Sequence, residues 1–69
     1  MLELVKTYRF GKWGYSEIEV WKDENGKRIF RVVNTVTGVS KDFDNWKHAE
    51  AEARYISDRY ESIQKQMGW

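Results

Sequence analysis

The chain contains no cysteine, and no run of apolar residues is longer than four. Without cysteine, neither a disulfide nor a thiolate metal site can hold the fold together, which is compatible with a reducing compartment. Without a long apolar run, the sequence predicts neither a membrane-spanning helix nor the apolar segment of a signal peptide. We therefore expect a soluble cytoplasmic protein that does not act at a membrane.

The usual marks of catalysis are also missing. His48 is the only histidine, so it has no partner for a metal site and no nucleophile to serve. The five glycines are isolated, which argues against a phosphate-binding loop, and the serines lack a recognisable nucleophile context. We predict a non-enzyme with no catalytic residue, no metal and no cofactor.

Length and composition favour one small folded domain. The 69 residues are 41% hydrophobic and 16% aromatic, which is too apolar for a disordered linker. The net charge of +1 divides unevenly: residues 1–41 carry eight Lys or Arg against five Asp or Glu, whereas residues 42–69 carry four against six. A dedicated nucleic-acid binder is usually more basic, so this balance favours a protein partner.

The last third of the chain predicts one long amphipathic helix. Its apolar residues recur at alternating steps of three and four: Trp46, Ala49, Ala53, Ile56, Tyr60, Ile63 and Met67. Asp44 is the predicted N-cap, and the helical part of the domain covers residues 44–67. A helix of this length is longer than the predicted strands, so we expect its final two turns, around Ile63 and Met67, to overhang them. Those turns either cover the connection near Trp13 or meet a second copy of the chain.

The first 43 residues predict an antiparallel sheet of three or four strands, at residues 2–10, 15–22, 28–36 and 39–43. We therefore expect an α+β fold in which the helix packs on one face of this sheet, forming a single domain over residues 1–69. Trp13, in the first connection, either caps the core or is exposed.

Two turns set the predicted register. A three-residue loop at residues 24–26, with Gly26 left-handed, places Ile18 opposite Val32 and keeps charge off the apolar face. A two-residue turn at residues 37–38 then places Val32 opposite Phe43.

The face of the sheet away from the helix is the predicted binding surface. The second and third strands direct six residues outward: Glu17, Glu19, Trp21, Ile29, Arg31 and Val33. A tryptophan beside aliphatic residues and an arginine is typical of protein-binding patches. The alternative is that a small open sheet exposes a few apolar side chains for want of polar ones to cover them.

Part of the chain resembles a known family. The resemblance is carried by Ile18-Glu19-Val20-Trp21, Gly26-Lys27, Arg31-Val32-Val33-Asn34, Val36, Gly38, Ser40 and Asp42-Phe43-Asp44. This pattern, over residues 15–46, resembles small phage-encoded anti-CRISPR proteins that inhibit the type I-F (Csy) surveillance complex.

The resemblance implies that the outer sheet face docks on the repeated backbone subunit of the RNA-guided complex and prevents target DNA from pairing. It also implies residence in the host bacterial cytoplasm. The family uses a tyrosine at the end of its second strand, where this chain has Trp21, and a first-strand tyrosine, for which Tyr8 is the nearest candidate. An acidic residue of the family's third strand is replaced here by Val33, and the family's two short helices are replaced by one long helix. The partner-binding residues that we predict are Trp21, Tyr8, Glu19, Arg31, Ile29 and Val33.

A second resemblance is to the three-strand-plus-helix DNA-binding domains of the AP2 and integrase-arm class. It is carried by Gly11-Lys12-Trp13, Glu17-Ile18 and Phe43-Asp44. Such domains lay the sheet in the major groove. Glu17 and Glu19 would repel phosphate there, although a basic rim could contact it: Lys12, Lys22, Lys27, Arg28 and Arg31. DNA binding is thus the alternative, and a homodimer formed through the helix overhang is a third possibility.

Overall fold

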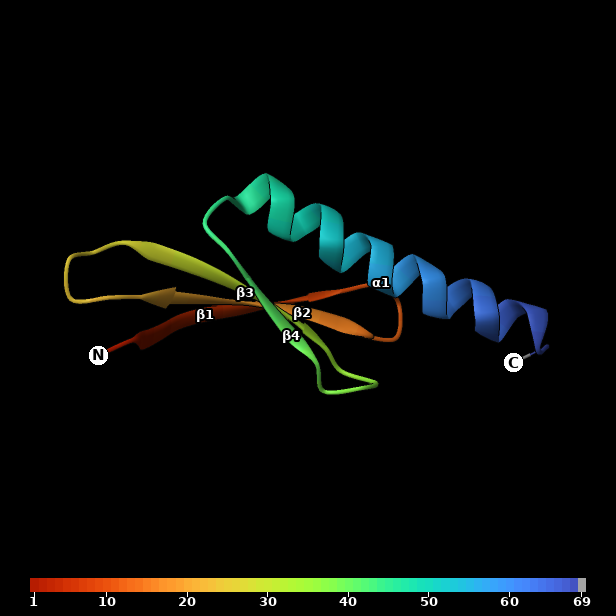
Figure 1. The fold of residues 1–69 in the computed structure, drawn as a ribbon. Coiled ribbons are helices and arrows are strands. Elements are labelled where there is room, and N and C mark those ends of the chain that lie inside the picture. Colours follow the sequence, from red (N-terminus) through yellow and green to blue (C-terminus); the bar gives the residue numbers. More distant parts are fainter. Residues whose placement is uncertain (69) are drawn as a thin grey trace.

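The computed structural model describes residues 1–68 and contains a four-stranded antiparallel sheet with one helix on one of its faces (Figure 1). The strands follow chain order across the sheet, β1-β2-β3-β4. The elements are β1 (Glu3–Phe10), β2 (Ser16–Lys22), β3 (Arg28–Asn34), β4 (Ser40–Phe43) and α1 (Trp46–Gln66). The predicted α+β architecture is confirmed, while Trp69, the last residue of the predicted domain, lies outside the described residues.

The hairpin between β2 and β3 has the predicted three-residue loop. The Asp23 N–H donates to the Lys27 carbonyl at 3.0 Å, and Gly26 has a φ of +82°. The Asp23 carboxylate also accepts hydrogen bonds from two backbone N–H groups of the turn. Ile18 consequently lies opposite Val32, and the predicted register is confirmed.

The predicted two-residue turn between β3 and β4 is wrong. The Asn34 N–H donates to the Val39 carbonyl at 2.8 Å, so residues 35–38 form a four-residue loop. The Asn34 side-chain oxygen accepts the backbone N–H groups of residues 36 and 37, at 2.9 and 3.2 Å, and thereby ends the strand two residues early.

This change moves β4 by two residues along β3. Phe43 lies opposite Phe30, whereas the prediction placed it opposite Val32. Because side chains alternate with a period of two, the shift leaves Phe43 on the predicted inner face and changes only its partner.

Strand β1 contains an irregularity that the sequence analysis did not predict. Leu4 pairs with Trp21, but Lys6 pairs with Val20, so Val5 is an extra residue, as in a β-bulge. Simple alternation along the strand would place every second residue after Leu4 on the same face of the sheet as Leu4. Because Val5 is an extra residue, those side chains lie on the opposite face.

The helix begins one residue later than predicted. Its N-cap is Asn45, not Asp44: the Asn45 backbone is extended, and its side-chain oxygen accepts the Lys47 N–H at 2.8 Å. An extended backbone is typical of N-cap residues, whose side chains turn back to accept an N–H of the first turn.

Small residues on α1 bring the helix close to the sheet. Ala49, Ala53 and Ser57 recur every fourth position and are all buried. They lie over Ile18 and Val32, which are the largest apolar side chains with almost no exposed surface. Five partly buried residues complete the core: Phe10, Phe30, Phe43, Trp46 and Ile56. The predicted stripe is confirmed over its first four members, with Ser57 as an addition.

A buried pair of hydroxyl groups ties the helix to the sheet. The Ser16 Oγ lies 2.7 Å from the Ser57 Oγ and donates to the Ala53 carbonyl at 2.6 Å. The Ser57 Oγ also reaches the Phe10 carbonyl at 3.0 Å. Buried polar groups cost free energy unless they are hydrogen-bonded, and here each hydroxyl has a partner on the opposite element.

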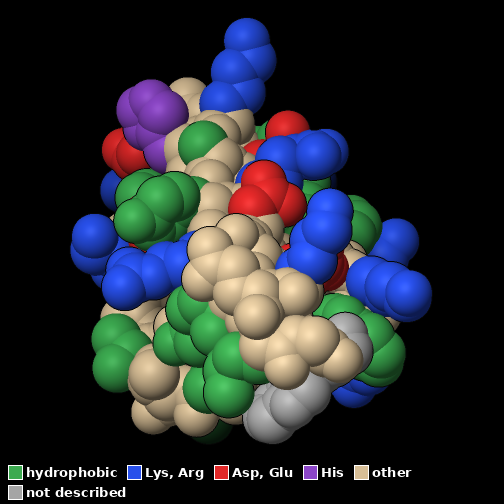
Figure 2. All heavy atoms as spheres, turned by 90° about the vertical axis from the view of Figure 1, so that its right-hand side faces the viewer, with side chains coloured by type: hydrophobic (Ala, Val, Ile, Leu, Met, Phe, Trp, Pro, Cys, Tyr) green, Lys and Arg blue, Asp and Glu red, His purple; other side chains and the backbone are tan. Residues whose placement is uncertain are grey.

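The last turns of α1 extend past the sheet, as predicted (Figure 1). Tyr60 still packs on Tyr15, with ring centroids 5.5 Å apart, whereas Ile63 and Met67 are exposed. The end-on view in Figure 2 shows hydrophobic side chains gathered in its lower half, with Lys and Arg side chains projecting around them. Trp13 is also exposed, so it does not cap the core.

We predict that Gly11→Ala is more damaging than Gly38→Ala. Both glycines have a φ of +80°, so each substitution carries the left-handed backbone cost of about 1–2 kcal/mol. At Gly11 a Cβ would also lie 2.7–2.9 Å from atoms of Ser57 and Glu61, whereas at Gly38 it would meet nothing within 4 Å. We expect Gly11→Ala to lose about 1–3 kcal/mol more in urea denaturation, because overpacking is added to strain. Equal losses would show that the helix does not approach residue 11 as described.

Candidate functional site

The outer face of the sheet brings together five of the six predicted site residues. Glu19 and Trp21 lie on β2, and Ile29, Arg31 and Val33 lie on β3. The register pairs Trp21 with Ile29 and Glu19 with Arg31, and all five side chains are partly exposed. No element of residues 1–68 packs across this face, since α1 lies on the other one (Figure 1).

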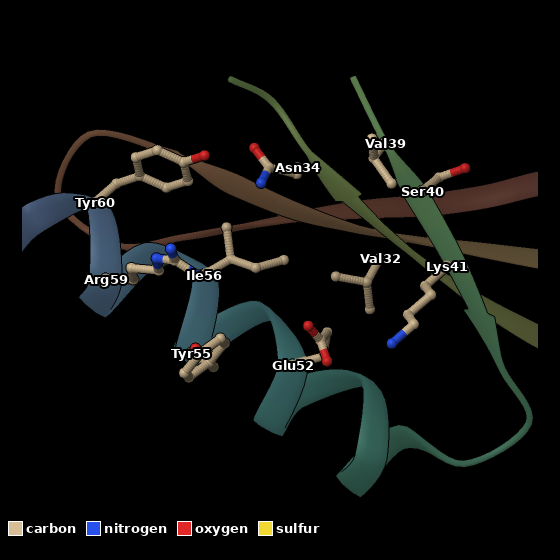
Figure 3. Close-up of a pocket in the computed structure, with 10 residues that line it drawn as sticks. All are labelled: Val32, Asn34, Val39, Ser40, Lys41, Glu52, Tyr55, Ile56, Arg59 and Tyr60. Atoms are coloured by element: carbon tan, nitrogen blue, oxygen red, sulfur yellow. The ribbon is translucent and has the colours of Figure 1, made fainter. Parts of the chain in front are cut away.

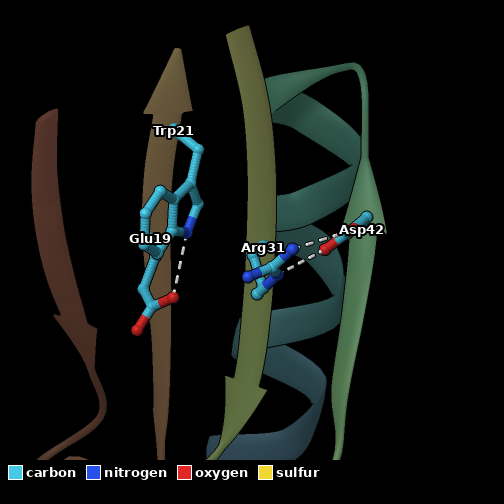
Figure 4. Close-up of polar contacts among 4 residues, drawn as sticks. All are labelled: Glu19, Trp21, Arg31 and Asp42. Atoms are coloured by element: carbon cyan, nitrogen blue, oxygen red, sulfur yellow. Dashed lines mark hydrogen bonds and ion pairs between the residues drawn. The ribbon is translucent and has the colours of Figure 1, made fainter. Parts of the chain in front are cut away.

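The indole of Trp21 is held in place from two sides (Figure 4). Its Nε1 donates to the Glu19 Oε1 at 3.0 Å, and the Arg31 guanidinium lies 5.4 Å from the centre of its ring. The first contact satisfies the only polar atom of the ring, and the second is a cation–π contact. The large apolar surface of Trp21 is therefore presented in one fixed orientation.

Asp42 completes this cluster from β4. The Arg31 Nε donates to the Asp42 Oδ1 at 2.8 Å, and the Nη2 donates to the Oδ2 at 3.4 Å (Figure 4). These hydrogen bonds lower the pKa of Asp42 below its ordinary value, slight burial opposes them, and the positive charge of Arg31 adds to the lowering. Asp42 is not among the predicted site residues because the predicted β3–β4 register, two residues off, does not place it opposite Arg31. The turn-forming side chain of Asn34 is the signal in the sequence that indicates the correct register.

The other charges on this face are also matched. The Arg9 Nε lies 3.2 Å from the Glu17 Oε1, an ion pair that joins β1 to β2. On this face Arg9 and Arg31 are thus each paired with a carboxylate. A surface of this kind attracts phosphate weakly, but it can be covered by a protein of mixed polarity.

Tyr8 is the predicted site residue that lies elsewhere. It follows the irregularity at Val5, pairs with Ile18, and faces the helix. Its ring packs edge-to-face on Trp46, with centroids 5.1 Å apart. Tyr8 is therefore separated from the Trp21 cluster by the thickness of the sheet.

The helix side of the sheet has a groove of about 260 Å³ between α1 and the strands β3 and β4 (Figure 3). Val32 and Ile56 meet at its floor, and the Tyr60 ring closes one end. Its lining residues are Val32, Asn34, Val39, Ser40, Lys41, Glu52, Tyr55, Ile56, Arg59 and Tyr60. The groove can bury an apolar side chain.

The described residues contain no group of three or more His, Cys, Asp or Glu side chains that could hold a metal ion. Between residues 1 and 68 there is likewise no helix long and apolar enough to cross a membrane. No family model, curated protein or solved structure matches the chain.

We predict that Asp42→Asn makes stability less dependent on pH. Because the folded-state pKa of Asp42 lies below its unfolded value, the ion pair stabilises the fold above the unfolded pKa of about 4 and is lost as the pH falls through the folded pKa. Both partners are partly exposed, so solvent screening limits the expected loss at neutral pH to less than about 1 kcal/mol.

Urea denaturation at about pH 7 and about pH 2.5 checks this prediction, because these values bracket the carboxylate range. At the higher pH the free energy of unfolding of the wild type should exceed that of Asp42→Asn, and this difference should shrink at the lower pH. Asp58→Asn, on the exposed side of α1, is the control. A difference in the free energy of unfolding that persists unchanged at low pH would contradict the ion-pair assignment.

Proposed function

We propose that this chain is a non-enzymatic binding module that docks on a protein surface through the outer face of its sheet. The observation that carries this proposal is the fixed Trp21 indole, held by Glu19 and Arg31 on an open face. Rigid aromatic side chains flanked by arginine contribute a large share of the energy in protein interfaces. A preordered indole loses little conformational entropy on binding.

The arrangement around Trp21 fits such an interface. Ile29 lies directly opposite it across β2 and β3, and Val33 extends the apolar surface beyond Arg31. Arg31 and Asp42 already satisfy one another, so a partner can cover them without leaving a buried charge unpaired. The face thus combines an apolar anchor with a polar surround, as interfaces do.

We propose a CRISPR surveillance complex of type I as the first partner to test. The support is the resemblance of residues 15–46 to anti-CRISPR proteins, because this segment includes the strands β2 and β3 that carry Trp21 and Arg31. In that role the chain occupies the protein backbone of the guide-bearing complex and prevents target DNA from binding. Glu17, Glu19 and Asp42 on the face disfavour the alternative, in which the sheet enters a DNA groove.

We predict that Trp21→Ala weakens partner binding about 30-fold or more and leaves the fold intact. Trp21 is partly exposed and outside the core, and loss of a central aromatic anchor costs about 2 kcal/mol or more, roughly 30-fold in affinity. The measurement is a competition gel shift with purified type I surveillance complex, labelled target DNA, and wild-type or variant protein. Trp13→Ala is the matched control, because Trp13 is an exposed tryptophan in the β1–β2 connection, outside the strands that form this face.

The wild type and Trp13→Ala should suppress the shift of the complex, and Trp21→Ala should not. Neutralising Lys27 and Arg28 should have a smaller effect. A shift of duplex DNA in the lane that holds only protein and DNA, weakened for all sequences by a change of Lys27 alone, would instead establish the DNA-binding alternative. Full activity of a folded Trp21→Ala variant would contradict the proposed interface.

A further inference from the structure

The helix leaves one end of its own sheet face uncovered. Helix α1 begins near the middle of the sheet and runs away from the β2–β3 turn, so the strand ends beside that turn have no helix above them (Figure 1). A cleft of about 320 Å³ lies there, on the face opposite to Trp21. Its lining residues are Val5, Lys6, Tyr8, Val20, Arg28, Phe30 and Trp46.

Three aromatic rings meet in this cleft. Trp46, the first residue of α1, packs edge-to-face on both Tyr8 and Phe30, at centroid distances of 5.1 and 5.7 Å. All three rings keep exposed surface, and Tyr8 is the most open of them at 37%. The cleft therefore offers ring surface to a ligand in addition to an apolar floor.

Two cations flank the rings. Lys6 on β1 and Arg28 on β3 lie on opposite sides of β2, which places their strands about 10 Å apart. The Lys6 Nζ lies over the face of the Tyr8 ring, 4.7 Å from its centre, so a base stacks on this face only when the ammonium moves aside towards a phosphate. Within residues 1–68, neither Lys6 nor Arg28 forms an ion pair, in contrast to the arginines of the outer face.

The charge beside the cleft is also mainly positive. Lys22 pairs with Arg28 across the hairpin and continues the basic row beyond the cleft. Glu3, opposite Lys22 on β1, is the acidic residue of that row, and Glu24 is paired with the N-terminal ammonium of Met1.

We propose that this cleft binds single-stranded nucleic acid. Bases of a single strand can stack on the Tyr8 and Trp46 rings while the phosphates lie against Lys6 and Arg28, the combination used by proteins that bind single strands without sequence preference. A duplex keeps its bases stacked inside and cannot reach the rings. An acidic peptide without aromatic side chains would satisfy the cations but leave the ring surfaces without a stacking partner.

This site does not rest on the outer-face interface. It lies on the opposite side of the sheet and shares no residue with the Trp21 cluster. Either proposal can therefore be wrong while the other holds. The isolated protein is sufficient for the test, whereas the outer-face proposal needs the surveillance complex.

We predict that the protein binds a labelled oligothymidine in fluorescence anisotropy at low salt, and that Lys6→Gln combined with Arg28→Gln weakens binding at least about tenfold. Loss of two phosphate contacts should also reduce the slope of log K against log salt by about 1.4, at about 0.7 per contact for single strands. The matched control is Arg59→Gln combined with Lys65→Gln, which removes one arginine and one lysine from exposed positions on α1. All four side chains are exposed, so none of these changes should unfold the protein.

Stacking is tested separately with Tyr8→Leu, which keeps an apolar contact for Trp46 but removes the ring; binding should weaken about fivefold or more. Inorganic polyphosphate and oligoglutamate are the competitors, and the proposal expects both to compete poorly. The proposal is overturned if oligothymidine does not bind, if the control pair weakens binding as much as the cleft pair, or if polyphosphate or oligoglutamate competes as well as unlabelled oligothymidine.

Discussion

The close contact between α1 and the sheet is the constraint on which the rest of the structure depends. Ala49, Ala53 and Ser57 place almost no side-chain bulk between the helix and the strands, so Ile18 and Val32 can be fully buried by a domain of this size. The Ser16–Ser57 hydroxyl pair fixes the position of the helix along the sheet. Gly11 allows the β1–β2 connection to pass beside the same part of the helix.

This mode of packing divides the sheet into surfaces of different chemistry. A single helix can cover only one face, and it covers that face incompletely because it crosses the sheet from its middle and overhangs one end. On the free outer face Arg9 and Arg31 are each paired with a carboxylate, which suits a protein partner. At the uncovered end of the inner face Lys6 and Arg28 have no acidic partner within the described residues, which suits an anionic one.

Much of this fold could be predicted because local residue patterns carry it. The apolar stripe of the helix and the Asp23–Gly26 turn are signals within a few residues of chain, and the turn alone fixes the Trp21–Ile29 and Glu19–Arg31 pairs. Five of the six predicted site residues share the outer face for this reason.

The misses have a different physical origin. The extra residue at Val5 depends on how β1 pairs with β2, and the sequence of β1 alone does not indicate it. As a result Tyr8 lies on the helix side of the sheet. The side chain of Asn34 competes with the backbone for the turn N–H groups, which moves β4 and gives Arg31 the partner Asp42. Both effects are long-range or side-chain-specific, and strand alternation does not report them.

Hydroxyl-radical footprinting of the protein, free and bound to a type I surveillance complex, tests the central claim most directly. The account predicts that oxidation of Trp21 falls on binding, while Tyr55 on α1 and Met67 at its C-cap, which are both exposed, remain as reactive as in the free protein. Protection of the helix residues with Trp21 still fully reactive would contradict the claim that the outer sheet face is the binding surface.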